Sequence, residues 1–241
     1  MARLSVAAGI FLLSVASASA QDITLNFGGG TGLTERVIQL IALLSVLSLA
    51  PSILIMVTSF TRIVVVLSLL RSALGSGTAP PNAVMISLAL FLTAFVMAPT
   101  FERAWEVGLR PLMQNEIQAE QAFERASEPF KTFMLGHVRE KDLALFLDLS
   151  NSARPNAPED VSLRVLVPAF MISELKRAFE IGFLLFVPFL VIDLVVSSIL
   201  MSMGMMMLPP IVVSLPFKLI FFVLVDGWNL VAGALVKSYG G

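Results

Sequence analysis

Two isolated charges near the C-terminal end are the side chains best placed to make a specific interaction. Asp193 is the only Asp, Glu, Lys or Arg in 181–217, and Lys218 follows that stretch directly. A charge within apolar sequence is costly to bury and usually faces protein or water. Both residues lie at nearly equal distances along the chain from Met206. A fold-back there predicts an ion pair, within one hairpin or between subunits. The alternative is two independent charges that extend to a polar boundary.

The turn between these charges is rich in methionine, since 201–210 reads MSMGMMMLPP. Thioether side chains are unbranched and polarisable, so they adapt to varied surfaces. Around a symmetric pore, Met205, Met206 and Met207 would form a deformable apolar seal. The alternative is that they are ordinary lipid-facing or core methionines.

Arg62 is a third isolated charge, because it lies between two apolar runs. It marks a kink between the runs, contacts the carbonyl groups of a partner, or lies at a membrane interface. The sequence leaves these three interpretations open.

Residue patterns for catalysis or cofactor binding are absent from the sequence. Gly75-Ser76-Gly77 lacks the Lys-Ser/Thr ending of a phosphate-binding loop, and neither Gly-x-Ser-x-Gly nor His-Glu-x-x-His occurs. The chain has no cysteine, which excludes disulfides and thiolate metal sites, and its one histidine is His137. Its net charge of −1 gives no basic excess for nucleic acid. We therefore expect a protein that is not an enzyme and that uses no cofactor or metal.

The composition of the 241-residue chain indicates a membrane protein. Hydrophobic residues make up 57% and charged residues 14%, whereas soluble domains have about 45–50% and 25%. Gaps between charges predict four apolar elements, near 36–70, 82–100, 179–204 and 208–237. Backbone groups in lipid must be satisfied within the segment, so these elements should be helices. We expect an all-α membrane protein.

Prolines interrupt several of these apolar elements. Pro51 lies in the first, Pro188 in the third, and Pro216 in the fourth. Proline removes a backbone donor and clashes with the preceding turn, so it kinks or breaks a helix. We therefore expect two kinked membrane hairpins, over 36–100 and 181–241.

A polar block, 101–180, separates the two hairpins. Ser127 and Pro129 suggest the start of an amphipathic helix there. The stretch 150–160 is rich in turn residues, and 161–180 should form a helix, kinked near Pro168, that continues into the third apolar element.

The first twenty residues have the pattern of a secretory signal peptide, which also bears on orientation. Arg3 precedes a short apolar stretch, and Ala18-Ser19-Ala20 predicts cleavage between Ala20 and Gln21. The alternative, a first membrane helix, is disfavoured because the stretch is too short to span a bilayer. Residues 21–35 would then be a flexible entry segment. Cleavage places the polar block outside the cytoplasm, although the positive-inside rule favours the opposite orientation.

Long sequence strings resemble the FliP family of flagellar type III export-gate proteins. The resemblance covers nearly everything from about residue 36 to Tyr239. The strings are 47–54, 58–63, 69–75, 80–82, 91–93, 97–99, 166–170, 172–179, 191–194, 203–210 and 215–219. The signal peptide favours a resemblance to the flagellar branch of the family, because the injectisome relatives usually lack one.

The resemblance implies a pore-forming subunit of the flagellar export gate in the bacterial inner membrane, at the flagellar basal body. Several FliP copies would assemble with FliQ and FliR, beside FlhB and FlhA, and unfolded flagellar proteins would pass through. The 205–207 turn matches the methionine gasket of the family. The alternative is a subunit of a small-solute or ion transporter, since transporters also use broken helices and midplane charges. Transporters usually have inverted repeats, and none is evident in this sequence.

Overall fold

The computed structural model describes residues 33–150, 157, 160–205 and 207–240, and all regular elements in this part are helical. The signal peptide, the cleavage site at Ala20 and Gln21, and most of the entry segment lie outside the described residues. In chain order the elements are α2 (Leu33–Met56), α3 (Phe60–Leu74), α4 (Asn82–Ala104), the π-helix η1 (Trp105–Leu109), α5 (Arg110–Met113), α6 (Ala119–His137), α7 (Glu140–Leu149), α8 (Leu163–Ser202), α9 (Pro210–Leu224) and α10 (Gly227–Lys237).

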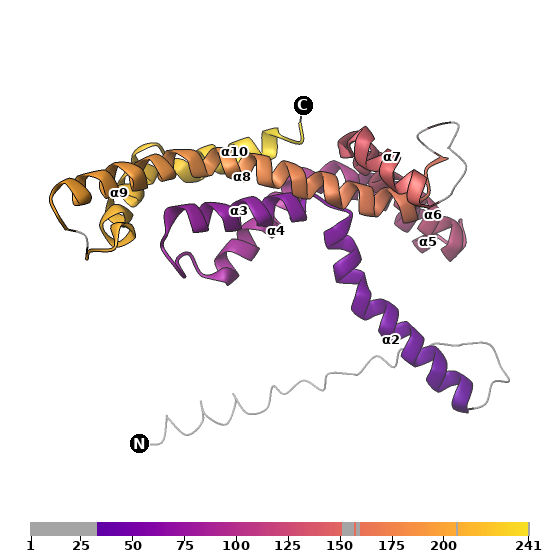
Figure 1. The fold of residues 1–241 in the computed structure, drawn as a ribbon. Helices are drawn as coiled ribbons and strands as arrows, with labels where there is room; N and C mark the ends of the chain where they lie inside the picture. The colour runs from indigo at the N-terminus through magenta and orange to yellow at the C-terminus, as the bar shows by residue number, and fades with distance from the viewer. Residues whose placement is uncertain (1–32, 151–156, 158–159, 206, 241) are drawn as a thin grey trace, which may run out of the picture. The chain divides into compact units, whose positions relative to one another are not determined.

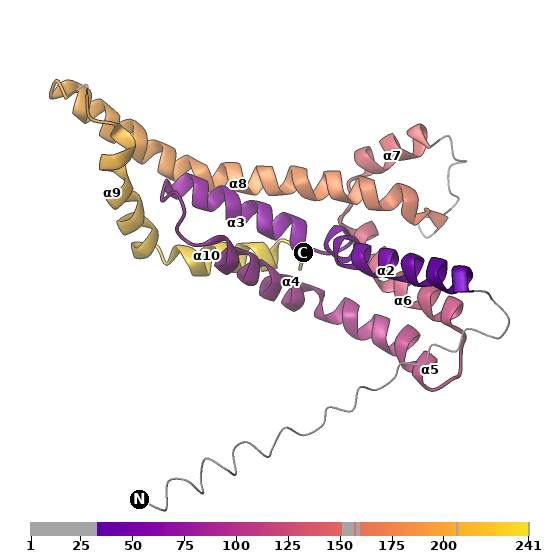
Figure 2. The same ribbon diagram turned by 90° about the horizontal axis from the view of Figure 1, so that it is seen from below.

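The chain divides into two units, 1–47 and 48–241, and the features below belong to the second. Its longest element is α8, a helix of 40 residues. Helix α3 lies alongside the middle of α8 in both ribbon views (Figures 1 and 2). At one end of α8 the chain folds back into α9, and near the other end pack α6 and α7 (Figure 2).

Three helical stretches are long and apolar enough to cross a membrane: 37–56, 82–113 and 163–202. Helices α9 and α10 together would make a fourth, bent by 63°. The prediction of an all-helical membrane protein is therefore confirmed, although its elements begin and end at other residues.

The prolines predicted to interrupt the apolar elements, Pro51, Pro188 and Pro216, all lie inside helices that continue past them. Pro51 lies inside α2 and Pro188 inside α8, and neither ends its helix. The first predicted element instead breaks at 57–59, where the Phe60 amide donates to the Thr58 hydroxyl. The fourth breaks at Asp226, whose backbone is left-handed (φ 51°). Membrane helices tolerate proline where neighbouring groups accept the freed carbonyls, so proline alone does not locate the breaks.

The polar block is less separate than its composition suggests. Helix α8 begins at Leu163 and runs through the predicted boundary at 180 into the third apolar element. Ser127 was predicted wrongly as a helix start, because α6 begins at Ala119 and Ser127 donates to the Glu124 carbonyl within it. The Ala, Glu, Gln and Arg residues of 119–125 favour helix strongly enough to extend α6 backwards.

The main core surrounds α3, which is too short to be a span. Ile63, Val66 and Leu70 are fully buried, against residues of α4, α8 and α10. Gly182 permits the close contact of α3 and α8, because a Cβ there would lie 2.3 Å from Leu69 Cδ1. The outer faces of α4 and α8 expose large apolar side chains, such as Phe91 and Phe183. These faces require lipid or partner proteins to cover them.

Candidate functional site: two ion pairs and a methionine-rich hairpin tip

The structure brings Asp193 of α8 and Lys218 of α9 together. Lys218 Nζ lies 2.7 Å from Asp193 Oδ2, and the Ser214 hydroxyl donates to Asp193 Oδ1 at 2.6 Å. Lys218 is 3% exposed, and the side chain of Asp193 is 27% exposed. The pair therefore connects the two arms of the hairpin within one chain, which is the intrachain version of the predicted contact.

Lys218 also connects this hairpin to the end of α3. Its Nζ donates to the Ala73 carbonyl at 3.1 Å, where the last carbonyls of α3 carry a partial negative charge. Gly75 ends α3 in the left-handed conformation (φ 72°), with its amide donating to the Ser72 carbonyl. A Cβ on Gly75 would lie 3.7 Å from Lys218 Nζ, so the ammonium group sits close over this turn. One buried cation thus joins α3, α8 and α9.

Arg62 lies in the first turn of α3, directly after the break at 57–59, and pairs with Glu174 of α8. Arg62 Nε donates to Glu174 Oε2 at 2.9 Å, and the second guanidinium nitrogen also contacts this carboxylate. Both side chains are at most 1% exposed. Arg62 therefore lies next to a helix break, in an ion pair within its own chain. The carbonyl group that it contacts is Ser238 O of its own chain, at 3.2 Å.

The end of the chain completes this second cluster. The Tyr239 ring lies 3.8 Å from the Arg62 guanidinium carbon, and its hydroxyl donates to Glu174. Tyr239 also stacks on Phe133 and contacts the ring of His137, both in α6. Burial, and then the negative charge of Glu174, raises the pKa of Tyr239 above its usual value. Tyr239 thus links α3, α6 and α8.

Glu174 and Tyr239 were not among the predicted site residues. Glu174 is separated from Arg62 by 112 positions, so no local motif connects them. A signal was nevertheless present. Glu174 repeats at helical spacing with Leu166, Phe170 and Ala178, which are all buried. A charge in phase with a buried stripe requires a partner inside the protein.

A third polar cluster joins α7 to α8. Ser173 donates to Asp142 at 2.6 Å, and the Arg139 guanidinium contacts the same carboxylate. Burial alone would raise the pKa of Asp142, but the hydrogen bonds from Ser173 and Arg139 outweigh it and hold that pKa below its usual value. This cluster fixes α7 against α8 outside the predicted apolar elements.

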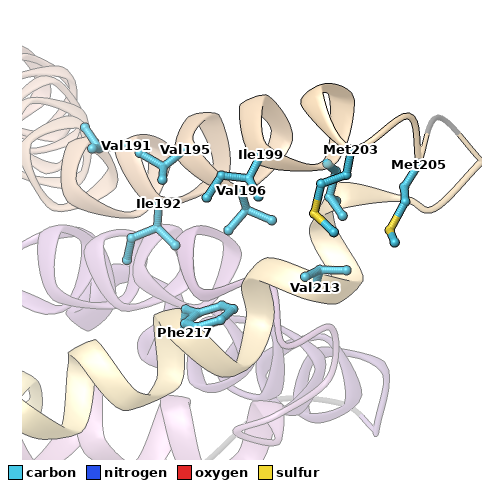
Figure 3. Close-up of a pocket in the computed structure, with 10 residues that line it drawn as sticks. Val191, Ile192, Val195, Val196, Ile199, Met203, Met205, Val213 and Phe217 are labelled. Atoms are coloured by element: carbon cyan, nitrogen blue, oxygen red, sulfur yellow. The ribbon is translucent and has the colours of Figure 1, made fainter.

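The methionine-rich turn forms the tip of the α8–α9 hairpin, where Gly204 is left-handed (φ 74°). Met206 lies outside the described residues. Met207 is 99% exposed. Met203 and Met205 line an apolar groove of about 510 Å³ between the two arms, together with residues such as Val196, Val213 and Phe217 (Figure 3). The tip therefore presents flexible apolar groups without a covering element of its own chain.

Groups that could hold a metal ion are absent from the described residues, where no three His, Asp or Glu side chains gather. The polar side chains form ion pairs between helices instead. Helices of spanning length, charges paired within the fold and an exposed methionine tip together define an all-helical membrane protein.

Comparison with known proteins then assigns the family. The FliP family model matches residues 43–235, so the chain belongs to the FliP family. A flagellar biosynthetic protein FliP of Caulobacter vibrioides is 62% identical over 240 residues, covering 99% of this chain and 90% of that protein. Proteins of the same name are 55% identical in Bacillus subtilis (84% of this chain, 91% of that protein) and 50% identical in Aquifex aeolicus (95% and 97%).

Proposed function

We propose that this protein is a pore-forming subunit of the flagellar protein export gate. Several copies surround a channel in the inner membrane at the flagellar basal body, together with FliQ and FliR and beside FlhB and FlhA. Unfolded flagellar proteins pass through this channel. The observation that carries the proposal is the family match over 43–235, which includes the whole α8–α9 hairpin and its methionine tip.

Two features of the chain support a role within an assembly. The outer faces of α4 and α8 leave large apolar side chains uncovered, which suits contact with lipid and other subunits. The hairpin tip exposes Met207, and thioether groups adapt to substrates of varied shape. The buried ion pairs join helices within the chain, and we propose that they hold the hairpin in place. The family match favours protein export over transport of small solutes.

Capture of a stalled export substrate tests this proposal. A flagellar subunit fused to a tightly folded domain should jam in the channel of cells that depend on this chain. A photo-reactive amino acid at position 207 should then cross-link to the stalled substrate. The same group at position 183, on the outer face of α8, is the matched control and should not react with it. Equal labelling from both positions, or none from 207, would contradict a channel at the tip.

A further inference from the structure

A small polar pocket lies between the end of α4 and the C-terminal half of α6. It has a volume of about 280 Å³, and its polar lining groups come from Thr100, Arg103, Thr132 and His137. Neither Asp nor Glu is among the described residues that line it. The pocket therefore presents donors and positive charge without an internal counter-charge.

Two of these groups have no partner among the described residues. The Thr100 residue is more than nine-tenths buried, but its hydroxyl is open to the pocket and makes no hydrogen bond there, whereas Thr93 in the same helix donates to the Ala89 carbonyl. Arg103 is exposed and forms no ion pair within the described part of the chain. Unlike these two, Thr132 bonds to Glu128 O, and His137 Nδ1 lies 2.7 Å from Phe133 O. A hydroxyl and a guanidinium that open onto one pocket, and that have no partner among the described residues, can both donate to an anionic ligand there.

The same chain carries unpaired carboxylates on another face. Glu120 and Glu124 of α6 are exposed and have no ion pair in the described residues, while Glu128 pairs with Lys131 at 3.9 Å. Each lies two positions from Ala122, which is buried where α6 packs on η1. Two positions turn a helix by about 200°, so both carboxylates point away from α4 and from the pocket beside it.

We propose that the pocket receives a carboxylate from the acidic face of α6, Glu120 or Glu124, of a second copy of this chain. The guanidinium of Arg103 binds the carboxylate through parallel N–H groups, and the Thr100 hydroxyl donates to it from the pocket floor. Pocket and acidic face are different surfaces of one chain, so the contact is head-to-tail. Such contacts close into rings when the rotation permits. The inference deepens the proposed function, on which it rests, by naming a contact between neighbouring copies.

Cross-linking between differently tagged copies tests the geometry, because the chain has no cysteine of its own. One copy carries Arg103→Cys, and the other carries Glu124→Cys or Glu120→Cys. The complex is purified from membranes of cells that produce all natural partners, and a short bismaleimide is added. We expect a product that contains both tags. The control pair, Arg103→Cys with Glu140→Cys on α7, should give none.

Charge reversal tests the energetics in the same complex. Arg103→Glu should lower the ratio of assembled to free chain by at least about tenfold, as expected when a charge pair loses one partner. The double change Glu120→Lys with Glu124→Lys should act similarly, and combining both reversals should restore assembly. Arg110→Glu, at an exposed arginine of α5, is the matched control and should have little effect.

The outcomes separate this contact from the proposed function. A multi-copy complex without the specific cross-link, or without rescue by the combined reversal, overturns this contact alone. If Arg103→Glu instead removes co-purified phospholipid and leaves assembly unchanged, the pocket binds a lipid headgroup and the proposal is overturned. A wild-type complex with a single copy of the chain would overturn both the contact and the channel-forming role.

Discussion

The Arg62 guanidinium and the Glu174 carboxylate form a buried ion pair that joins the first turn of α3 to α8 across 112 positions of sequence. Neither side chain is more than 1% exposed. Ser238 and Tyr239 satisfy the remaining faces of the guanidinium. Arg62 therefore connects the chain near its first helix break both to α8, through Glu174, and to the C-terminal segment, through Ser238 and Tyr239.

Removing one member of this pair should be far more harmful than removing both. Arg62→Leu or Glu174→Leu leaves an uncompensated buried charge, which typically lowers the free energy of unfolding by about 3–5 kcal/mol. The double variant should lose much less. Unfolding in mild detergent, followed by circular dichroism, measures the difference. Lys176→Ala, which breaks an exposed pair with Glu180, should change stability little. Equal losses in the single and double variants would contradict this account.

Tyr239 should make the protein sensitive to alkali. Its pKa is raised in the folded state, so the neutral phenol contributes stability below the unfolded value of 10.0. Above that pH the unfolded chain ionises first, and the free energy of unfolding should fall by about 1.4 kcal/mol per pH unit. The comparison with Tyr239→Phe isolates this slope from other groups. Since the chain has one tyrosine, ultraviolet absorbance also follows its ionisation directly. A phenolate signal that appears near pH 10.0, the usual pKa of tyrosine, while the protein is still folded would refute the prediction.

Asp142 should make the contact between α7 and α8 sensitive to acid. Its pKa is lowered, so the ionised carboxylate contributes stability above the unfolded value of 3.8, and this is lost as pH falls through the folded pKa. The protection of α7 amides from hydrogen exchange, relative to their intrinsic exchange rates, should therefore be high at neutral pH and should fall below pH 3.8. In Asp142→Asn this protection should be lower at neutral pH and should depend much less on pH. Protection of α7 that does not change with acid would exclude this role.

The Asp193–Lys218 pair should respond differently to neutralisation and to reversal. Lys218→Met or Asp193→Leu alone removes hydrogen bonds to a charged group, which are worth about 1.5–3 kcal/mol, and should reduce assembly and swimming. The neutral double variant should be milder than either single change. Reversal, Asp193→Lys with Lys218→Asp, should rescue less, because it places a carboxylate beside the Ala73 carbonyl. A double-mutant cycle measures the coupling. Additive single effects would show that the residues act separately.

The sequence predicted the apolar helices because charge gaps are a direct consequence of the cost of burying charge in lipid. It also placed Asp193 and Lys218 at one height, since a hairpin relates residues equidistant from its tip. The position of the breaks could not be predicted in the same way. Proline weakens a helix locally, but whether the helix continues depends on neighbouring groups that sequence does not reveal. At the first break, for example, the Tyr239 hydroxyl lies 3.4 Å from the Ser59 carbonyl oxygen, across 180 positions of sequence.

The second ion pair shows the same limit. Arg62 was recognisable as an isolated charge, yet three interpretations remained because its partner lies 112 positions away. Glu174 belongs to a charged stretch, 174–177, that resembles an exposed helical face. Only its phase with buried neighbours distinguishes it from Lys176, which is exposed and pairs with Glu180. The burial of Tyr239 could not be predicted, because it lies outside any helix and so no helical spacing relates it to buried neighbours.

The methionines at the hairpin tip should be required for a tight closed channel and not for assembly. Replacing Met205, Met206 and Met207 by alanine removes flexible apolar groups at a tip that makes few contacts, where Met207 is 99% exposed. We expect normal assembly and increased leakage of ions, followed with a potential-sensitive dye. Leucine at the same three positions keeps the apolar volume and should retain the seal. Met113→Ala, also at an exposed methionine, is the control. If the assembled alanine variant leaks no more than the wild type, these residues do not close the channel.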